Sequence, residues 1–118
     1  MNKIQALNTF WNLFDLPAYD ETAMPDGVQM PYITYEAIID DFDHNVMPTA
    51  SLWYYSSSLS EVSQKALEIE AFLGDGGRVM RYDNGIMWIR KGNPFAQRVA
   101  DSNDMVKRMV LNLIIEFV

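Results

Sequence analysis

The chain contains no cysteine, and this absence excludes a disulfide framework, a thiolate metal site and a cysteine nucleophile. It also lacks the run of about 18 apolar residues that a membrane-spanning helix needs, because Asn112 and Glu116 interrupt the longest candidate. The N-terminal residues Met1–Ala6 include one basic residue and several polar ones, unlike a signal peptide. We therefore expect a soluble, intracellular protein with no membrane association.

Basic residues are scarce in the first two thirds of the chain. Residues 1–76 hold only Lys3 and Lys65 against twelve acidic residues, whereas residues 77–118 hold seven basic residues against four acidic ones. A net charge of −7 argues against a nucleic-acid-binding protein, which usually carries a basic domain. Such a division of charge suits head-to-tail contact with copies of the chain or with a partner of complementary sign. The alternative is that the two halves mix on the folded surface.

A length of 118 residues, 49% of them hydrophobic and 13% aromatic, indicates one domain spanning residues 1–118 with its own core. Apolar residues at helical spacing predict an amphipathic helix over residues 4–14: Ile4, Leu7, Phe10, Trp11 and Phe14. Residues 15–31 then contain three prolines, one glycine and four acidic residues, which predicts a long loop. Loops of this length in a small domain are usually functional or mobile.

Two strands and a second helix are expected in the middle of the chain. Residues 32–40 alternate between apolar and polar positions, and residues 52–56 are rich in the aromatic residues that strands favour. Ser58 and Glu61 have capping-box spacing, which predicts that a helix begins there. Its apolar stripe runs to a glycine stop: Val62, Ala66, Ile69, Leu73 and Gly74.

Residues 78–91 predict a β-hairpin, because Asn84-Gly85 is the preferred type I′ turn pair. Pairing outward from this turn gives three expected cross-strand pairs: Tyr82 with Met87, Arg81 with Trp88 in a cation–π contact, and Met80 with Ile89. Gly92-Asn93-Pro94 is expected to end the hairpin.

The alternation over residues 105–118 predicts a last strand, although a subset of its apolar residues also fits a helix. The order of elements predicts an α+β fold. In this fold an antiparallel or mixed sheet of about five strands carries the N-terminal helix and the second helix on one face.

One cluster of side chains could be imagined as a metal or acid–base site: Asp40, Asp41, Asp43 and His44. Neighbouring strand residues point to opposite faces, so Asp40 and Asp41 would not share an ion while the strand continues. The spacing also lacks the glycine and the terminal glutamate of a calcium loop. The serines of residues 56–58 do not form a nucleophile elbow, because no glycine flanks them. The glycines of residues 74–77 do not form a phosphate-binding loop, because they follow a helix rather than a strand. We therefore expect no enzymatic activity, no metal and no cofactor.

Four segments resemble the small tail-completion and head–tail joining proteins, the tail terminators, of long-tailed phages and prophages. They are the entry into the first strand (Met30–Tyr35), the aromatic strand before the helix (Leu52–Tyr55), the hairpin (Asp83–Ile89), and the last strand, which Asp101 introduces and which runs through Lys107–Leu113. The resemblance covers roughly residues 4–117.

The resemblance implies a structural virion protein that forms a six-fold ring at the head-proximal end of the tail tube. Such a ring stops tube growth and presents a surface to the head. The implied partners are further copies of the chain, the tail tube protein and a head-completion or connector protein. The implied location is the virion tail, and the cytoplasm of the bacterial host during assembly. DNA would pass through the lumen without specific binding, and an acidic lining would repel its phosphates.

A ring needs two different contact patches on each subunit, which a chain with divided charge can supply. Loop 15–31 and the connection over residues 40–50 are natural contact sites. The candidates for the interface or the lumen are Asp40, Asp41, Asp43, Tyr19, Glu21, Arg78, Arg90 and Lys91.

Two other functions stay open on the sequence alone. A small-molecule- or peptide-binding α+β module would place Trp53, Tyr55 and Trp88 around a pocket. A metal-assisted hydrolase would use Asp40, Asp43 and His44. The structural role is favoured because the sequence shows no convergent set of polar groups.

Overall fold

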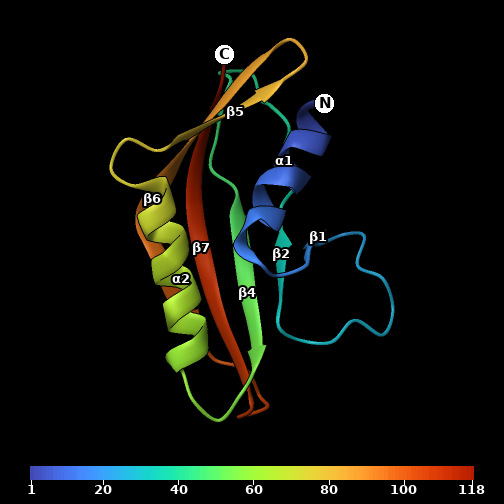
Figure 1. Ribbon diagram of the computed structural model, residues 1–118, viewed down its shortest axis with the longest axis vertical. Coiled ribbons are helices and arrows are strands. Elements are labelled where there is room, and N and C mark those ends of the chain that lie inside the picture. The colour runs from blue at the N-terminus through green and yellow to red at the C-terminus, as the bar shows by residue number, and fades with distance from the viewer.

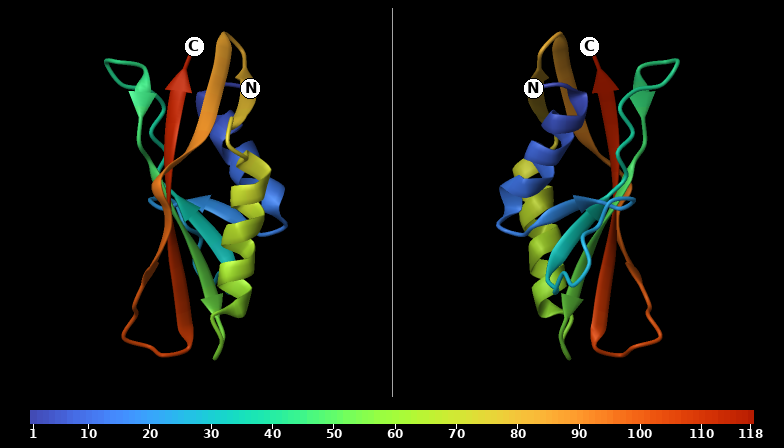
Figure 2. Two further views of the ribbon diagram at one scale, coloured as in Figure 1. Left: turned by 90° about the vertical axis from the view of Figure 1, so that its left-hand side faces the viewer. Right: turned by 90° about the vertical axis from the view of Figure 1, so that its right-hand side faces the viewer.

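Two helices lie on one face of a twisted, mixed β-sheet in the computed structural model, which describes residues 1–118 (Figures 1 and 2). The helices are α1 (Lys3–Trp11), the short 3-10 helix η1 (Asn12–Phe14) and α2 (Ser60–Leu73). The strands are β1 (Ala18–Asp20), β2 (Tyr32–Tyr35), β3 (Asn45–Val46), β4 (Thr49–Tyr55), β5 (Arg78–Tyr82), β6 (Gly85–Val99) and β7 (Val106–Phe117). Neither helix combines the length and the apolar character needed to cross a bilayer.

The sheet has the strand order β1-β2-β4-β7-β6-β5, and β3 pairs separately with β7. Only β1 and β2 are parallel, and every other pair is antiparallel. The expected α+β fold with both helices on one face is confirmed, with seven strands rather than about five. β7 is the central strand, because β3, β4 and β6 all pair with it.

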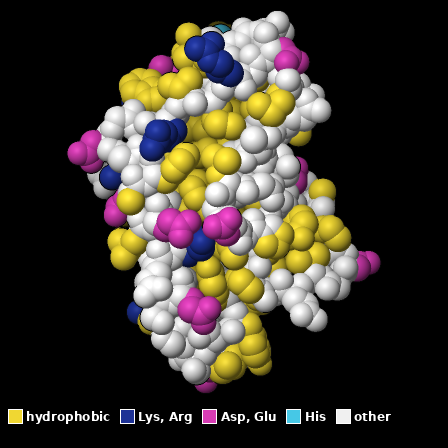
Figure 3. Space-filling view, viewed as in Figure 1, with side chains coloured by type: hydrophobic (Ala, Val, Ile, Leu, Met, Phe, Trp, Pro, Cys, Tyr) yellow, Lys and Arg dark blue, Asp and Glu magenta, His cyan; other side chains and the backbone are white.

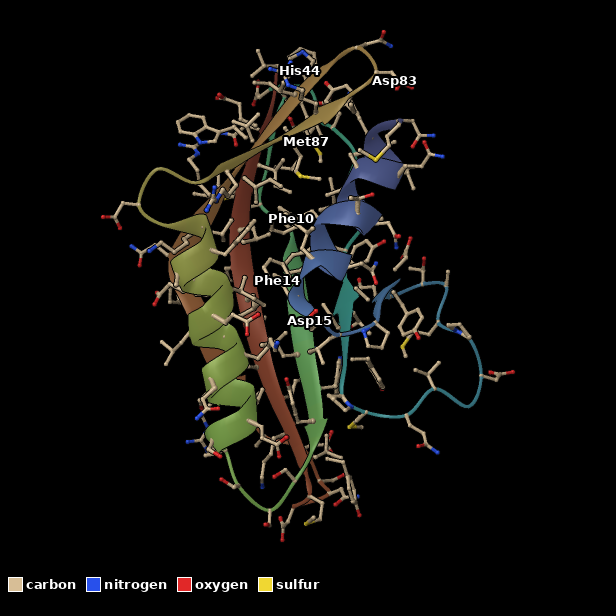
Figure 4. All side chains as sticks on the ribbon, in the orientation of Figure 1. Phe10, Phe14, Asp15, His44, Asp83 and Met87 are labelled. Atoms are coloured by element: carbon tan, nitrogen blue, oxygen red, sulfur yellow. The ribbon has the colours of Figure 1, made fainter.

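The core fills the space between the helices and the sheet. Alternate residues of β7 are buried there, which confirms a strand rather than a helix: Met109, Leu111, Leu113, Ile115 and Phe117. The predicted stripe of α2 is buried as well. Phe10 and Phe14 point into the same space (Figure 4), where Phe14 makes an edge contact with Phe72 of α2 at a centroid distance of 5.3 Å.

Three details of the helices differ from the expectation. Ile4 is 53% exposed, because the packed face of α1 runs through Ala6 and Leu7 instead. The predicted capping box at Ser58 and Glu61 is wrong: α2 begins at Ser60, and Ser58 Oγ accepts a hydrogen bond from the Ser60 N–H at 3.1 Å. A true capping box stands at the start of α1. In that box the Asn2 side chain accepts from the Gln5 N–H and the Gln5 side chain accepts from the Asn2 N–H.

The hairpin register is shifted by two residues from the prediction. Tyr82 pairs with Gly85 and Met80 with Met87, so that Asp83 and Asn84 form the turn, and neither has a positive φ. The turn is therefore not type I′. Because the shift is an even number of residues, each side chain keeps its expected face.

Gly85 is required for a different reason, its closeness to the C-terminal end of β7. A Cβ at this position would lie 2.1 Å from the Val118 carbonyl oxygen. Ile86 and Val118 exchange two backbone hydrogen bonds beside it. This approach between β6 and the end of the chain, rather than the turn, explains the glycine.

Three observed boundaries of strands and loops also differ from the expected ones. β6 does not end at Gly92-Asn93-Pro94 but continues to Val99, with a register shift between Lys91 and Ala96. The strand expected over residues 32–40 ends at Tyr35, and β1 lies inside the expected loop 15–31. Pairing with β2 and β7 supplies hydrogen bonds that the local sequence does not reveal.

Candidate functional site

The face of the sheet that carries no helix has an unusual composition. In a sheet with one face on the core, the other face is normally polar. Beside uncharged polar residues such as Gln97 and Asn112, the outward positions here carry five aromatic, six aliphatic and three arginine side chains: Tyr19, Tyr32, Trp53, Tyr55, Trp88, Val79, Ile86, Val99, Val106, Val110, Ile114, Arg81, Arg90 and Arg108. We term these residues the open sheet face. The outward positions of these strands include a single acidic residue, Glu116, and no lysine.

An aromatic ladder crosses four strands on the open sheet face. The rings of Tyr19 on β1 and Tyr32 on β2 are 6.3 Å apart, and Tyr32 and Trp53 on β4 are 6.4 Å apart. The guanidinium of Arg108 on β7 lies over the Trp53 ring at 4.5 Å. Aromatic and cation–π contacts of this kind hold the rings in one orientation.

Two buried hydroxyl groups on the same face of the sheet hold the ladder in place. Thr34 and Ser51 are the only buried polar residues of the chain. The Trp53 Nε1–H donates to Thr34 Oγ1 at 2.9 Å, and Arg108 Nε–H donates to Ser51 Oγ at 3.1 Å. The two terminal nitrogens of Arg108 have no acceptor within the chain. Arg108 is thus preorganised to offer its planar fork to a carboxylate or phosphate.

Arg90 repeats this arrangement toward the other end of the face. Its guanidinium lies 4.0 Å from the centre of the Trp88 ring, and the Trp88 Nε1–H donates to the Gly76 carbonyl at 2.7 Å. Arg90 Nε is buried and has no hydrogen-bond partner. Although the chain carries sixteen acidic residues, none of its five arginines forms an ion pair. Arginine, tryptophan and tyrosine are the residues enriched where proteins bind one another.

Asp40, a predicted interface or lumen residue, is engaged inside the chain. Its carboxylate lies 2.6 Å from Lys3 Nζ and 3.0 Å from His44 Nδ1. Lys3 in turn lies over the rings of Tyr82 and Phe117, at 5.5 and 5.0 Å. The hydrogen bond from Lys3, the largest influence, lowers the pKa of Asp40 to about 2. This cluster joins α1 to the end of the sheet at which Figure 4 labels His44 and Asp83.

The other two aspartates of the cluster differ from Asp40. Asp41 Oδ1 accepts hydrogen bonds from the backbone N–H groups of Asp43 and Asn45, which shapes a loop in which His44 has a φ of 59°. The Asp43 carboxylate has no partner and is exposed. No group of three His, Asp or Glu side chains converges in a way that could hold a metal ion.

The remaining candidates do not form one site. Tyr19 and Arg90 lie on the open sheet face, and Glu21 is exposed in the loop after β1. Arg78 lies on the helix side, where its Nε–H donates to the Phe72 carbonyl at 2.7 Å. Lys91 also lies on the helix side, 3.7 Å from the Asp75 carboxylate.

Of the three aromatic residues expected around one pocket, Trp53 and Tyr55 are neighbours on one face of β4, and Trp88 is far from both. Trp53 pairs with Arg108 and Trp88 with Glu116, which are eight residues and about 27 Å apart along β7. Tyr55 borders a shallow hollow of about 280 Å³ with Val28, Gln29 and Met30. Neither the role of Arg108 nor the ladder was predicted from the sequence. The available signal was the apolar residues on both faces of the strands, such as Val110 and Ile114 in β7.

Comparisons of the chain with protein-family models, with curated proteins and with solved structures found no match in any of the three.

Proposed function

We propose that the chain is a structural virion protein of a long-tailed phage or prophage, a tail terminator that forms a ring at the head-proximal end of the tail. The observation that carries this proposal is the open sheet face. It is a broad surface of aromatic rings, aliphatic side chains and unpaired arginines on which no helix lies, and its most exposed apolar side chains are Tyr55 and Val79. Such a surface is typical of a protein that functions by association.

The location of the resembling segments supports the same proposal. All four lie along the sheet: in and before β2, in β4, in the β5–β6 hairpin, and in β7 with the connection before it. The resemblance to tail terminators therefore concerns the scaffold of the open sheet face. Its partners under this proposal are further copies of the chain, the tail tube protein and a head-completion or connector protein, and DNA passes through the ring.

The direct test adds the protein to growing tail tubes of the same phage and measures tube lengths by electron microscopy. We expect the wild-type protein to stop elongation at one end. Arg108→Glu should abolish this effect, because it reverses the charge on the open sheet face. Arg98→Glu is the matched control, since Arg98 is on the neighbouring strand but faces the helix side opposite Met109. Tubes of unchanged length with the wild-type protein would refute the proposal.

A further inference from the structure

We propose that the open sheet face of one subunit binds the solvent face of α2 of the next copy, head to tail. This inference rests on the proposed ring and names the two surfaces that would build it. The solvent face of α2 is the set of exposed residues opposite its buried stripe: Glu61, Gln64, Leu67, Glu68 and Ala71.

The solvent face of α2 combines an apolar centre with acidic neighbours. Leu67 is 62% exposed, and Glu61 and Glu68 lie on the same side of the helix two turns apart. Figure 3 shows acidic side chains gathered over this helix. The only basic residue of α2, Lys65, is turned inward, because its Nζ donates to the Phe14 carbonyl at 2.8 Å while it contacts Glu68.

The two surfaces complement each other in charge and in chemistry. Arg90 and Arg108 each have terminal nitrogens without an acceptor, held over a tryptophan ring. A guanidinium group binds a carboxylate, such as that of Glu61 or Glu68, through two parallel hydrogen bonds. The ladder of aromatic rings lies between Arg108 and the β1 edge of the sheet and offers an apolar surface for Leu67.

The placement of the two surfaces fixes the kind of assembly. Both helices lie on one side of the sheet (Figure 2), so α2 and the open sheet face point in opposite directions. A contact between them joins two different patches, and every added copy leaves one patch of each kind free. Such contacts close into a ring or continue as a filament, whereas a two-fold dimer would use one patch twice.

Charge reversal on each surface tests this contact. The open-face variant carries Arg90→Glu and Arg108→Glu, and the helix-face variant carries Glu61→Arg and Glu68→Arg. Each variant alone would bring like charges together, and we expect at least a tenfold loss of self-association by light scattering. An equimolar mixture should recover the wild-type mass, because both contacts in an alternating ring are then complementary.

The control for the mixture replaces the helix-face variant with Asp101→Arg, Asp104→Arg. This variant makes the same change of charge in the β6–β7 connection, which borders the N-cap residue Leu59 but contributes no residue to the solvent face of α2. It should not restore assembly of the open-face variant. Recovery with this control, or no recovery with the helix-face variant, would overturn the assignment of α2 as the partner surface.

Disulfide trapping in the presence of tail tubes tests the same contact if rings form only on the tubes. Because the chain has no cysteine, Leu67→Cys and Val110→Cys introduce the only thiols. They lie on opposite sides of the sheet, so a bond between them must join two copies. We expect a mixed Leu67–Val110 disulfide under mild oxidation and none for Asn84→Cys with Val110→Cys. A predominant Leu67–Leu67 bond, or no mixed bond, would contradict the inference.

The outcomes separate this inference from the proposed function. A wild-type protein that stops tubes and forms rings, with variants that show neither rescue nor mixed trapping, would refute the α2 contact alone. A wild-type protein that neither assembles nor stops tubes would refute both. Binding of duplex DNA by the wild-type protein, lost in the open-face variant, would assign the arginines to phosphates and overturn the α2 contact.

Discussion

Asp40 shows how the role of a residue depends on neighbours that the sequence does not reveal. From the sequence it belongs to an acidic cluster and is a candidate for a lumen or an ion site. In the structure its carboxylate lies between Lys3 and His44, and its side chain is 25% exposed. The sequence could not predict this pairing, because Lys3 lies 37 residues away on another element.

The pH dependence of stability should report this ion pair. The hydrogen bond from Lys3 lowers the Asp40 pKa from its usual 3.8 to about 2, and the same bond raises the Lys3 pKa. The stabilisation is therefore complete above the ordinary pKa of aspartate, is lost as the pH falls through about 2, and is lost again only in strongly alkaline solution above the ordinary pKa of lysine.

Asp40→Asn should lower the thermal midpoint at neutral pH, and the difference from wild type should decrease as the pH falls toward about 2 and disappear below it. Thermal unfolding followed by circular dichroism across this range measures the effect. Asp43→Asn is the control, because the Asp43 carboxylate has no partner. Equal midpoints for wild type and Asp40→Asn at pH 7 would contradict the role of the pair.

At the scale of elements, periodicity predicted most of the fold. The alternation in residues 105–118 and the stripe of Val62, Ala66, Ile69 and Leu73 both gave the right element and the right buried face. Local turn and breaker signals were less reliable. The hairpin register and the continuation of β6 through Pro94 depend on contacts with β7 and the chain's end, which no local window contains.

The buried face of β7 should dominate its contribution to stability. Leu111→Ala removes a fully buried side chain, and we expect a loss of about 2–5 kcal/mol in the free energy of unfolding. Val110→Ala, the next residue, changes a side chain on the open sheet face and should cost less than about 1 kcal/mol. Urea denaturation measures both, and similar losses would contradict the assignment of the two faces.

Two neighbouring glycines should differ in their tolerance of a side chain. Gly77 has a φ of 77°, and a Cβ there would lie 2.4 Å from the Ile89 carbonyl oxygen, whereas a Cβ at Gly76 would meet nothing within 4 Å. Gly77→Ala should lower the free energy of unfolding by about 1–3 kcal/mol, and Gly76→Ala by less than about 0.5 kcal/mol. Equal effects in a denaturation experiment would show that β5 can shift to accept the new atom.

At the scale of the whole molecule, the separation of charge in the sequence becomes only in part a difference between two faces. Three arginines lie on the open sheet face, and three glutamates lie on α2 across the sheet. The other four basic residues of the last third of the chain lie on the helix side: Arg78, Lys91, Arg98 and Lys107. The sequence indicated head-to-tail contact but could not identify the open sheet face. Its ladder joins β1, β2, β4 and β7, which are adjacent only after folding. Of the eight predicted residues, Tyr19 and Arg90 belong to this face.

The native mass of the wild-type protein tests the central claim most directly. It should be measured by light scattering over a wide concentration range, with and without short tail tubes, together with electron micrographs. The proposal predicts closed rings of about six copies, free in solution or at one end of each tube. A single copy or a two-fold dimer under both conditions would contradict it.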